Sequence, residues 1–211
     1  MRPAALLLDL DGTLVDSEPV HREAYRAFLA ERDWVIDDLG IFTGRRAEDV
    51  FAVEPGPWSA HDPHELAAEV RARVPDDATP EPVPGAHDVV HAAGAAGIPV
   101  AIVTSARPAW VSLAVGEALG VLDHIAVVVT ARDVAEGKPH PAGFLLACER
   151  LGVAAADCVA AEDSPAGVGA AVAAGVGRVV GVTTTWTEAE LTEAGAHVVL
   201  PDLRRVVDLL R

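Results

Sequence analysis

The chain carries, close to its start, the stretch Leu6-Leu7-Leu8-Asp9-Leu10-Asp11-Gly12-Thr13-Leu14-Val15-Asp16-Ser17. It begins as a continuous apolar run, which is typical of a strand buried on both faces. Asp9 and Asp11 follow one residue apart, and Gly12 permits a turn directly after them. Because bare carboxylates are costly to bury, we expect the strand to end here, at the carboxyl edge where open α/β sheets bind ligands. The two acids are either solvated groups at a strand end, or groups that hold a divalent cation or act as nucleophile and general acid.

The pattern of an apolar strand followed by a helix repeats in the second part of the chain. Glycines at 97, 120, 152 and 175 end the helical segments between the strands. Alternating strands and helices with short turns predict an α/β fold, in which a Rossmann-like parallel sheet forms the middle of three layers, α/β/α. The further strands are expected at residues 100–103, 125–129, 158–161, 179–182 and 197–200.

The segment 16–82 differs from what lies on either side of it. It shows helical spacing, it contains helix-starting signals at Ser17 and Asp62, and we expect it to be all-helical and free of strands. We therefore predict a core domain from residues 1–15 and 83–211, with residues 16–82 inserted as a small α-helical cap domain. An insertion after the first strand would lie over the edge that carries Asp9 and Asp11, which is the place for a lid.

Composition narrows the classes of partner. The chain has 211 residues, is 51% hydrophobic and carries a formal net charge of −16, so nucleic acid and anionic membrane surfaces are not expected partners. No stretch has the length and apolar character of a membrane span, and the early acids interrupt any signal peptide. The two cysteines, Cys148 and Cys158, are expected to be buried thiols in a reducing cytoplasm. We expect a monomer or a weak homodimer.

Polar residues follow several of the predicted strands. Taken singly they have simple explanations, because hydroxyls cap helices and loop lysines and turn acids are usually solvated. Together, three carboxylates around one point suit Mg²⁺, and a hydroxyl, backbone amides and a lysine suit a phosphoryl group. The lysine would also offset the negative charge and keep a nucleophilic aspartate ionised. Besides Asp9 and Asp11, these residues are Thr104, Ser105, Lys138, Glu162 and Asp163.

With these motifs the chain resembles the haloacid-dehalogenase-like hydrolase superfamily over nearly its whole length. The order and spacing of four motifs carry the resemblance: Asp9-Leu10-Asp11-Gly12-Thr13, Val103-Thr104-Ser105, Gly137-Lys138-Pro139-His140-Pro141 and Ala161-Glu162-Asp163-Ser164-Pro165-Ala166-Gly167. The resemblance implies that Asp9 is the nucleophile, which forms an aspartyl-phosphate. It also implies that Asp11 is the general acid and base.

The resemblance further implies a Mg²⁺ cofactor and a phosphoryl-binding site. The metal would be held by the Asp9 carboxylate, the main-chain carbonyl of Asp11 and Asp163, with Glu162 assisting from behind or through a water. The transferring group would be bound by Thr104 and Lys138, and by backbone amides near Asp11, Gly12 and Ser105.

The inserted segment resembles the small cap that recognises the leaving group in this superfamily. Candidates for that role are Glu18, His21, Arg45 and Arg46. Arg45 is preferred because Gly44-Arg45 resembles the family's cap loop. Glu18 could instead only stabilise the first turn of its helix, and His21 could only face solvent.

Asp11 narrows the reaction, because the haloacid dehalogenases of the superfamily have no aspartate at this position. The motifs most resemble those of sugar and polyol phosphatases, which implies hydrolysis of a small phosphorylated metabolite. The alternative is a phosphosugar mutase related to β-phosphoglucomutase, whose members share Asp16 and His21. They usually have an arginine where this chain has Ala47 or Glu48. A non-enzymatic phospho-receiver would leave both Asp11 and the insertion unexplained.

Overall fold

The computed structural model describes residues 2–211, and its centre is a six-stranded sheet in the order β5-β4-β1-β6-β7-β8. Every neighbouring pair in this sheet runs parallel. The α/β class and the positions of all six predicted strands are confirmed. The strands are β1 (Ala5–Leu8), β4 (Val100–Val103), β5 (Val127–Val129), β6 (Cys158–Glu162), β7 (Arg178–Val182) and β8 (Val198–Leu200).

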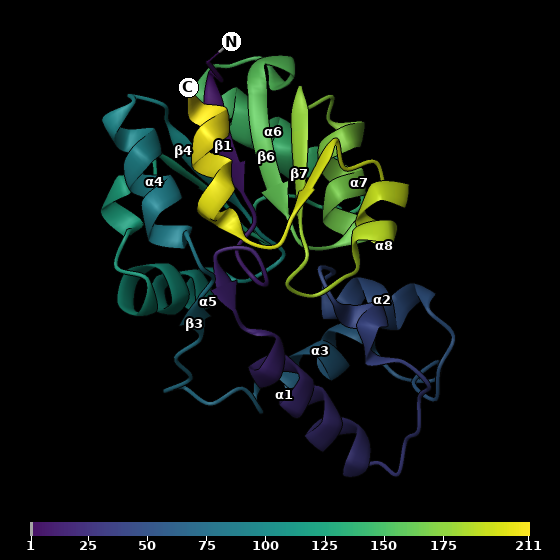
Figure 1. Ribbon diagram of the computed structural model, residues 1–211. Helices are drawn as coiled ribbons and strands as arrows, with labels where there is room; N and C mark the ends of the chain where they lie inside the picture. Colours follow the sequence, from purple (N-terminus) through teal and green to yellow (C-terminus); the bar gives the residue numbers. More distant parts are fainter. Residues whose placement is uncertain (1) are drawn as a thin grey trace.

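The sheet is covered by helices on both faces, as a three-layer arrangement requires (Figure 1). Leu6 and Leu8 belong to a hydrophobic cluster with α4 (Ala86–Ala95), α5 (Pro108–Val111) and the 3₁₀ helix η5 (Leu203–Leu210). Leu7 points to the other face, where the cluster includes α6 (Ala142–Leu151), α7 (Pro165–Ala173) and α8 (Glu188–Glu193). Burying each leucine contributes about 1.5–3 kcal/mol, so the apolar run fixes β1 in the middle of the core.

The helices of the inserted segment form a core of their own beyond the carboxyl ends of the strands (Figure 1). They are α1 (Glu18–Ala30), the 3₁₀ turn η1 (Leu39–Phe42), α2 (Ala47–Val53) and α3 (Pro63–Arg71). Phe28, Phe51 and Trp58 are buried there against one another. Trp58 is thus a core residue of the inserted segment.

The prediction that residues 16–82 contain no strand is wrong. Val15–Asp16 forms β2 and Glu81–Pro82 forms β3, and the two pair antiparallel. The chain enters and leaves the inserted segment at neighbouring points, so the two crossings bond to each other. A two-residue strand is too short to show the alternation by which strands are detected in a sequence.

Two helical segments are not regular α-helices. The segment that begins as α5 continues as a π-helix, η2 (Ser112–Ala118), and the last helix is the 3₁₀ helix η5. Short 3₁₀ turns also occur at η3 (Leu122–His124) and η4 (Ala155–Asp157). Cys148 and Cys158 are buried free thiols, as expected. None of the helices in residues 2–211 combines the length and the apolar character that crossing a bilayer requires.

Candidate active site

Three acids meet at the carboxyl edge of the sheet. Asp9 follows β1, Glu162 ends β6 and Asp163 comes next, and the two strands are hydrogen-bonded neighbours. One carboxylate oxygen from each acid lies within 4.8 Å of the others. All three side chains are buried, with at most 5% of the residue exposed. Parallel pairing thus brings together acids that are about 150 positions apart in the chain.

Lys138 is the cation inside this cluster. Its Nζ donates to Asp9 Oδ1 and lies 2.5 Å from Glu162 Oε1. Within residues 2–211, neither carboxylate oxygen of Asp163 has a hydrogen-bond partner. Buried oxygens without donors, next to two further carboxylates and only one lysine, fit a hard divalent cation such as Mg²⁺.

The crowded charge alters the protonation of the site. Burial, and then the charge of Glu162, raise the pKa of Asp9 to about 8, although Lys138 opposes them. Burial and the charge of Asp9 raise the pKa of Asp163 well above its ordinary value. Lys138 is also buried, which lowers its pKa, but Asp9 and Glu162 outweigh this and raise the pKa above its ordinary value. The lysine stays charged, and a metal ion must displace protons from the acids in order to bind.

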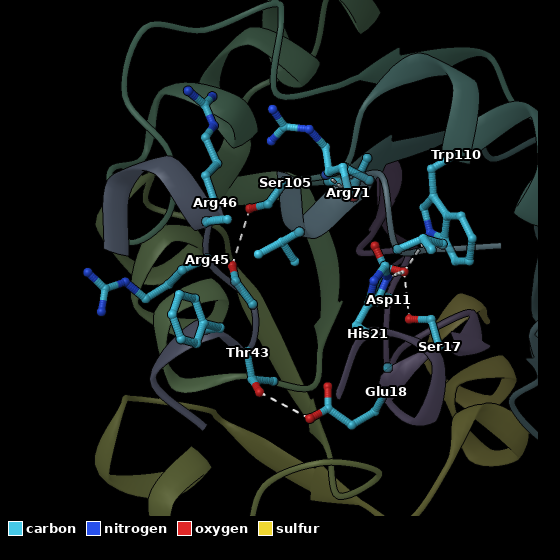
Figure 2. Close-up of a pocket in the computed structure, with 18 of the residues that line it drawn as sticks. Asp11, Ser17, Glu18, His21, Thr43, Arg45, Arg46, Arg71, Ser105 and Trp110 are labelled. Atoms are coloured by element: carbon cyan, nitrogen blue, oxygen red, sulfur yellow. Dashed lines mark hydrogen bonds and ion pairs between the residues drawn. The ribbon is translucent and has the colours of Figure 1, made fainter. Parts of the chain in front are cut away.

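Asp11 lies in a different setting, among hydrogen-bond donors (Figure 2). Its Oδ1 accepts from Ser17 Oγ at 2.6 Å and from Trp110 Nε1 at 2.7 Å, and His21 Nε2 is 3.4 Å away. Burial alone would raise the pKa of Asp11, but the hydrogen bond and charge of His21 hold it below its ordinary value. In return, Asp11 outweighs the effect of burial and raises the pKa of His21. The three donors fix the orientation of the Asp11 carboxylate.

Gly12 turns the chain tightly beside the acids. Its φ is +79°, and a β-carbon at this position would lie 2.1 Å from Asp163 Oδ2. Any other residue would push the acid out of place, which explains why glycine follows the two aspartates.

Thr104 and Ser105 follow β4 at the same edge and line the same cavity as Asp9 and Asp11. Thr104 is buried, and its Oγ1 accepts from the backbone N–H of Ala106 at 2.9 Å. Ser105 Oγ donates to the carbonyl of Gly44 at 3.2 Å, so it contacts the inserted segment (Figure 2).

The loop that carries Gly44 and Arg46 rests directly on the core. Gly44 has φ +75°, and a β-carbon there would lie 2.2 Å from Ser164 Oγ. Arg46 donates to the carbonyls of Val134 at 3.0 Å and Ala135 at 3.2 Å. The inserted segment and the core thereby enclose a cavity of about 450 Å³.

The four residues predicted to recognise the leaving group all line this cavity but have different partners. His21 contacts Asp11, and Glu18 pairs with Arg22 and accepts from Thr43. Arg45 pairs with Glu54 at 2.6 Å, and in Figure 2 its guanidinium points away from Asp11. Arg46 binds the core backbone, so neither arginine is directed at the acids.

Sequence reasoning misses two partners of Asp11 and the polar residues deeper in the cavity. It marks Ser17 only as a helix-starting signal, and it assigns no role to Trp110. Tyr25 lines the cavity one helical turn after His21, and this i to i+4 spacing on α1 is a signal that could identify it. Glu48 and Arg71 also line the cavity, and nothing in the local sequence marks them.

Comparison with known proteins agrees with this geometry. A family model described as haloacid dehalogenase-like hydrolase matches residues 3–175. Validoxylamine A 7'-phosphate phosphatase of Streptomyces hygroscopicus subsp. limoneus is 38% identical over 95% of this chain and 94% of its own. Fructose-1-phosphate phosphatase YqaB of Escherichia coli is 34% identical over 84% of this chain and 96% of its own.

Among solved structures, a putative β-phosphoglucomutase from Thermotoga maritima superposes with a TM-score of 0.68. It is 28% identical, and the match covers 100% of this chain and 98% of that one. The resemblance that the four motifs predict is confirmed. The chain belongs to the haloacid dehalogenase-like hydrolase family and is a hydrolase of the phosphatase class.

Proposed function

We propose that this enzyme is a Mg²⁺-dependent phosphatase of small phosphorylated metabolites, namely sugar or polyol phosphates, and that it works through an aspartyl-phosphate on Asp9. The observation that carries the proposal is that the two aspartates have different surroundings. Asp9 lies among buried acids beside Lys138, whereas Asp11 is held by three donors on the other side of the turn. The two relatives named as phosphatases of phosphorylated sugar-like compounds support the substrate class.

In the proposed reaction an Asp9 oxygen attacks phosphorus, and the bond from phosphorus to the leaving oxygen breaks. Asp11 gives a proton to that oxygen and then takes one from a water, which attacks the aspartyl-phosphate and releases phosphate from Asp9. Lys138 and Thr104 would bind the transferring group, together with backbone amides near Gly12 and Ser105. When bound, the metal ion supplies positive charge against the phosphoryl oxygens.

The metal would be held by the carboxylates of Asp9 and Asp163 and by the main-chain carbonyl of Asp11, with Glu162 behind them. The orphaned oxygens of Asp163 support this assignment. Residues 16–82 would act as the cap domain on a core of residues 1–15 and 83–211. The contacts of Gly44 and Arg46 with the core support that role, because they close the cavity over the acids.

A phosphosugar mutase is the second candidate. The same closing contacts favour it, since a mutase must keep water from its aspartyl-phosphate while the sugar reorients. The solved relative described as a putative β-phosphoglucomutase points the same way.

The test is to incubate the protein with Mg²⁺ and a panel of phosphate monoesters: sorbitol 6-phosphate, fructose 1-phosphate, 2-phosphoglycolate and p-nitrophenyl phosphate. Release of inorganic phosphate that EDTA abolishes is the expected result. A second arm supplies β-glucose 1-phosphate with a catalytic amount of glucose 1,6-bisphosphate. Formation of glucose 6-phosphate faster than phosphate would show a mutase. A long-lived phosphoprotein without turnover in either arm would favour a phospho-receiver.

A further inference from the structure

Each of three helices of the inserted segment brings to the cavity a polar side chain that has no hydrogen bond to the acids of the core. Tyr25 comes from α1, Glu48 from α2 and Arg71 from α3, and all three line the cavity. None of them is needed for the proposed phosphoryl transfer. They are therefore candidates for binding the part of the substrate beyond the phosphate.

Glu48 and Arg71 form a pair. Arg71 Nη1 donates to Glu48 Oε2 at 3.2 Å, and the side chains are 31% and 16% exposed for Arg71 and Glu48. The pair has no net charge, so it offers little attraction to an anionic leaving group. It still offers hydrogen bonds, because a guanidinium has five N–H donors and a carboxylate accepts at both oxygens.

Tyr25 adds a hydroxyl and a flat apolar surface beside this pair. Its ring stacks on Phe42, with centroids 4.2 Å apart and planes at 26°, and Phe42 also lines the cavity. Burial, and then the charge of Glu48, raise the pKa of the Tyr25 phenol above its ordinary value. The phenol therefore stays protonated and can both donate and accept a hydrogen bond.

We propose that Tyr25, Glu48 and Arg71 bind neighbouring hydroxyl groups of the leaving group, so that the preferred substrate is the phosphate monoester of a polyhydroxylated sugar, polyol or cyclitol. Each alcohol group both donates and accepts, and the three side chains provide an acceptor, a donor and a group that does both. The stacked rings suit the C–H face of such a molecule. The inference rests on the proposed function and specifies its substrate class.

A two-carbon acid would be a poor fit at the same site. Its carboxylate would face that of Glu48, and it would leave most of the hydrogen-bonding groups of the cavity without partners. The cavity volume of about 450 Å³ lies within the range of sites that enclose larger organic ligands. The polar set and the volume thus point to the same class of substrate.

The test compares kcat/KM for sorbitol 6-phosphate, 2-phosphoglycolate and p-nitrophenyl phosphate in the full chain with Mg²⁺. The variants are Tyr25→Phe, which keeps the stacked ring, and Glu48→Gln, which keeps the shape. Glu69→Gln is the matched control, since Glu69 lies on α3 of the inserted segment and, like Glu48, pairs with an arginine, Arg32, but does not line the cavity. Thermal melting checks that all variants are folded.

We expect the wild type to prefer sorbitol 6-phosphate over 2-phosphoglycolate. In both test variants the ratio of kcat/KM for sorbitol 6-phosphate to that for p-nitrophenyl phosphate should fall about tenfold. Tyr25→Phe loses the hydrogen bonds of the phenol, and Glu48→Gln replaces a charged acceptor by a donor. The control should keep the wild-type ratio. Turnover with unchanged ratios in Tyr25→Phe and Glu48→Gln, or a preference for 2-phosphoglycolate, would overturn this inference alone. No turnover of any ester would overturn the proposed function as well.

Discussion

Asp9 and Asp11 are separated by one residue in the chain but lie in opposite electrostatic environments. Around Asp9 the core gathers two further acids and one lysine, and the pKa of Asp9 rises to about 8. Around Asp11 three donors converge, and the pKa of Asp11 falls below its ordinary value. The surroundings of the two groups thus push their pKa values apart, and in the protein without metal Asp9 keeps its proton to higher pH than Asp11 does.

The largest loss of activity is expected from replacing the proposed nucleophile, Asp9. Asp9→Asn should lower kcat for sorbitol 6-phosphate by about 10⁴-fold or more, since an amide oxygen does not form the acyl-phosphate. The measurement is phosphate release at saturating Mg²⁺, with mass spectrometry to detect the phosphoprotein. Retention of a phosphoryl group on the Asp9→Asn variant would contradict the assignment.

Asp11→Asn tests the proposed general acid and base, and we expect a loss of about 10²–10⁴-fold in kcat. The loss should be larger for sorbitol 6-phosphate than for p-nitrophenyl phosphate. The reason is that an alkoxide needs a proton in order to leave, whereas p-nitrophenolate does not. An equal loss with both esters would argue against proton donation by Asp11.

The acids of the core edge could be predicted from the sequence, whereas most partners of Asp11 could not. Lys138 and Asp9 are 129 positions apart, but each follows or lies near a recognisable strand end, and a parallel sheet brings such ends together. Trp110 and Asp11 are 99 positions apart, and their contact depends on how the first turn of α5 is rotated. No rule of strand order specifies that rotation.

The same difference separates the core from the inserted segment. The four motifs and six strands follow from local patterns, which repeat along the chain. The meeting of Tyr25, Glu48 and Arg71 in one cavity arises from the packing of three helices on one another. The antiparallel pair β2 and β3 forms where the chain enters and leaves the inserted segment. The preferred cap residue, Arg45, lines the cavity but pairs with Glu54, because the C-terminal end of α2 offers this carboxylate nearby.

Trp110→Phe tests the surroundings of Asp11 alone, and we expect a smaller loss of kcat than for the two aspartate variants. It removes the 2.7 Å donor to Asp11 while keeping an aromatic ring, and we expect kcat to fall about tenfold. The lost hydrogen bond also helped to hold the pKa of Asp11 down. The acidic limb of the pH profile of kcat should therefore move to higher pH.

The matched control is Trp34→Phe, since Trp34 packs on Phe28 in the inserted segment and does not line the cavity. It should leave both kcat and the pH profile unchanged. A fall in kcat without any shift of the acidic limb in Trp110→Phe would indicate that the indole only supports packing.

The last effect concerns stability without metal, and not catalysis. Asp9 keeps its proton up to about pH 8 in the folded protein but loses it near 3.8 when free of this environment. A raised pKa of an acid stabilises the fold below the lower value, and this stabilisation is lost as pH rises through the upper one. In EDTA the Tm should therefore fall between pH 5 and pH 8 by about ten degrees, because one proton bound only in the folded state changes the free energy of unfolding by about 1.4 kcal/mol per pH unit.

Mg²⁺ should reverse this trend, because it binds the ionised acids, whereas at acid pH it must first displace their protons. The gain in Tm on adding Mg²⁺ is thus expected to grow from acid to neutral pH. Asp9→Asn has no carboxylic proton at this position, so its Tm in EDTA should depend less on pH than that of the wild type. If the Tm of Asp9→Asn in EDTA depends on pH as steeply as that of the wild type, the charge that destabilises the metal-free core lies on a residue other than Asp9.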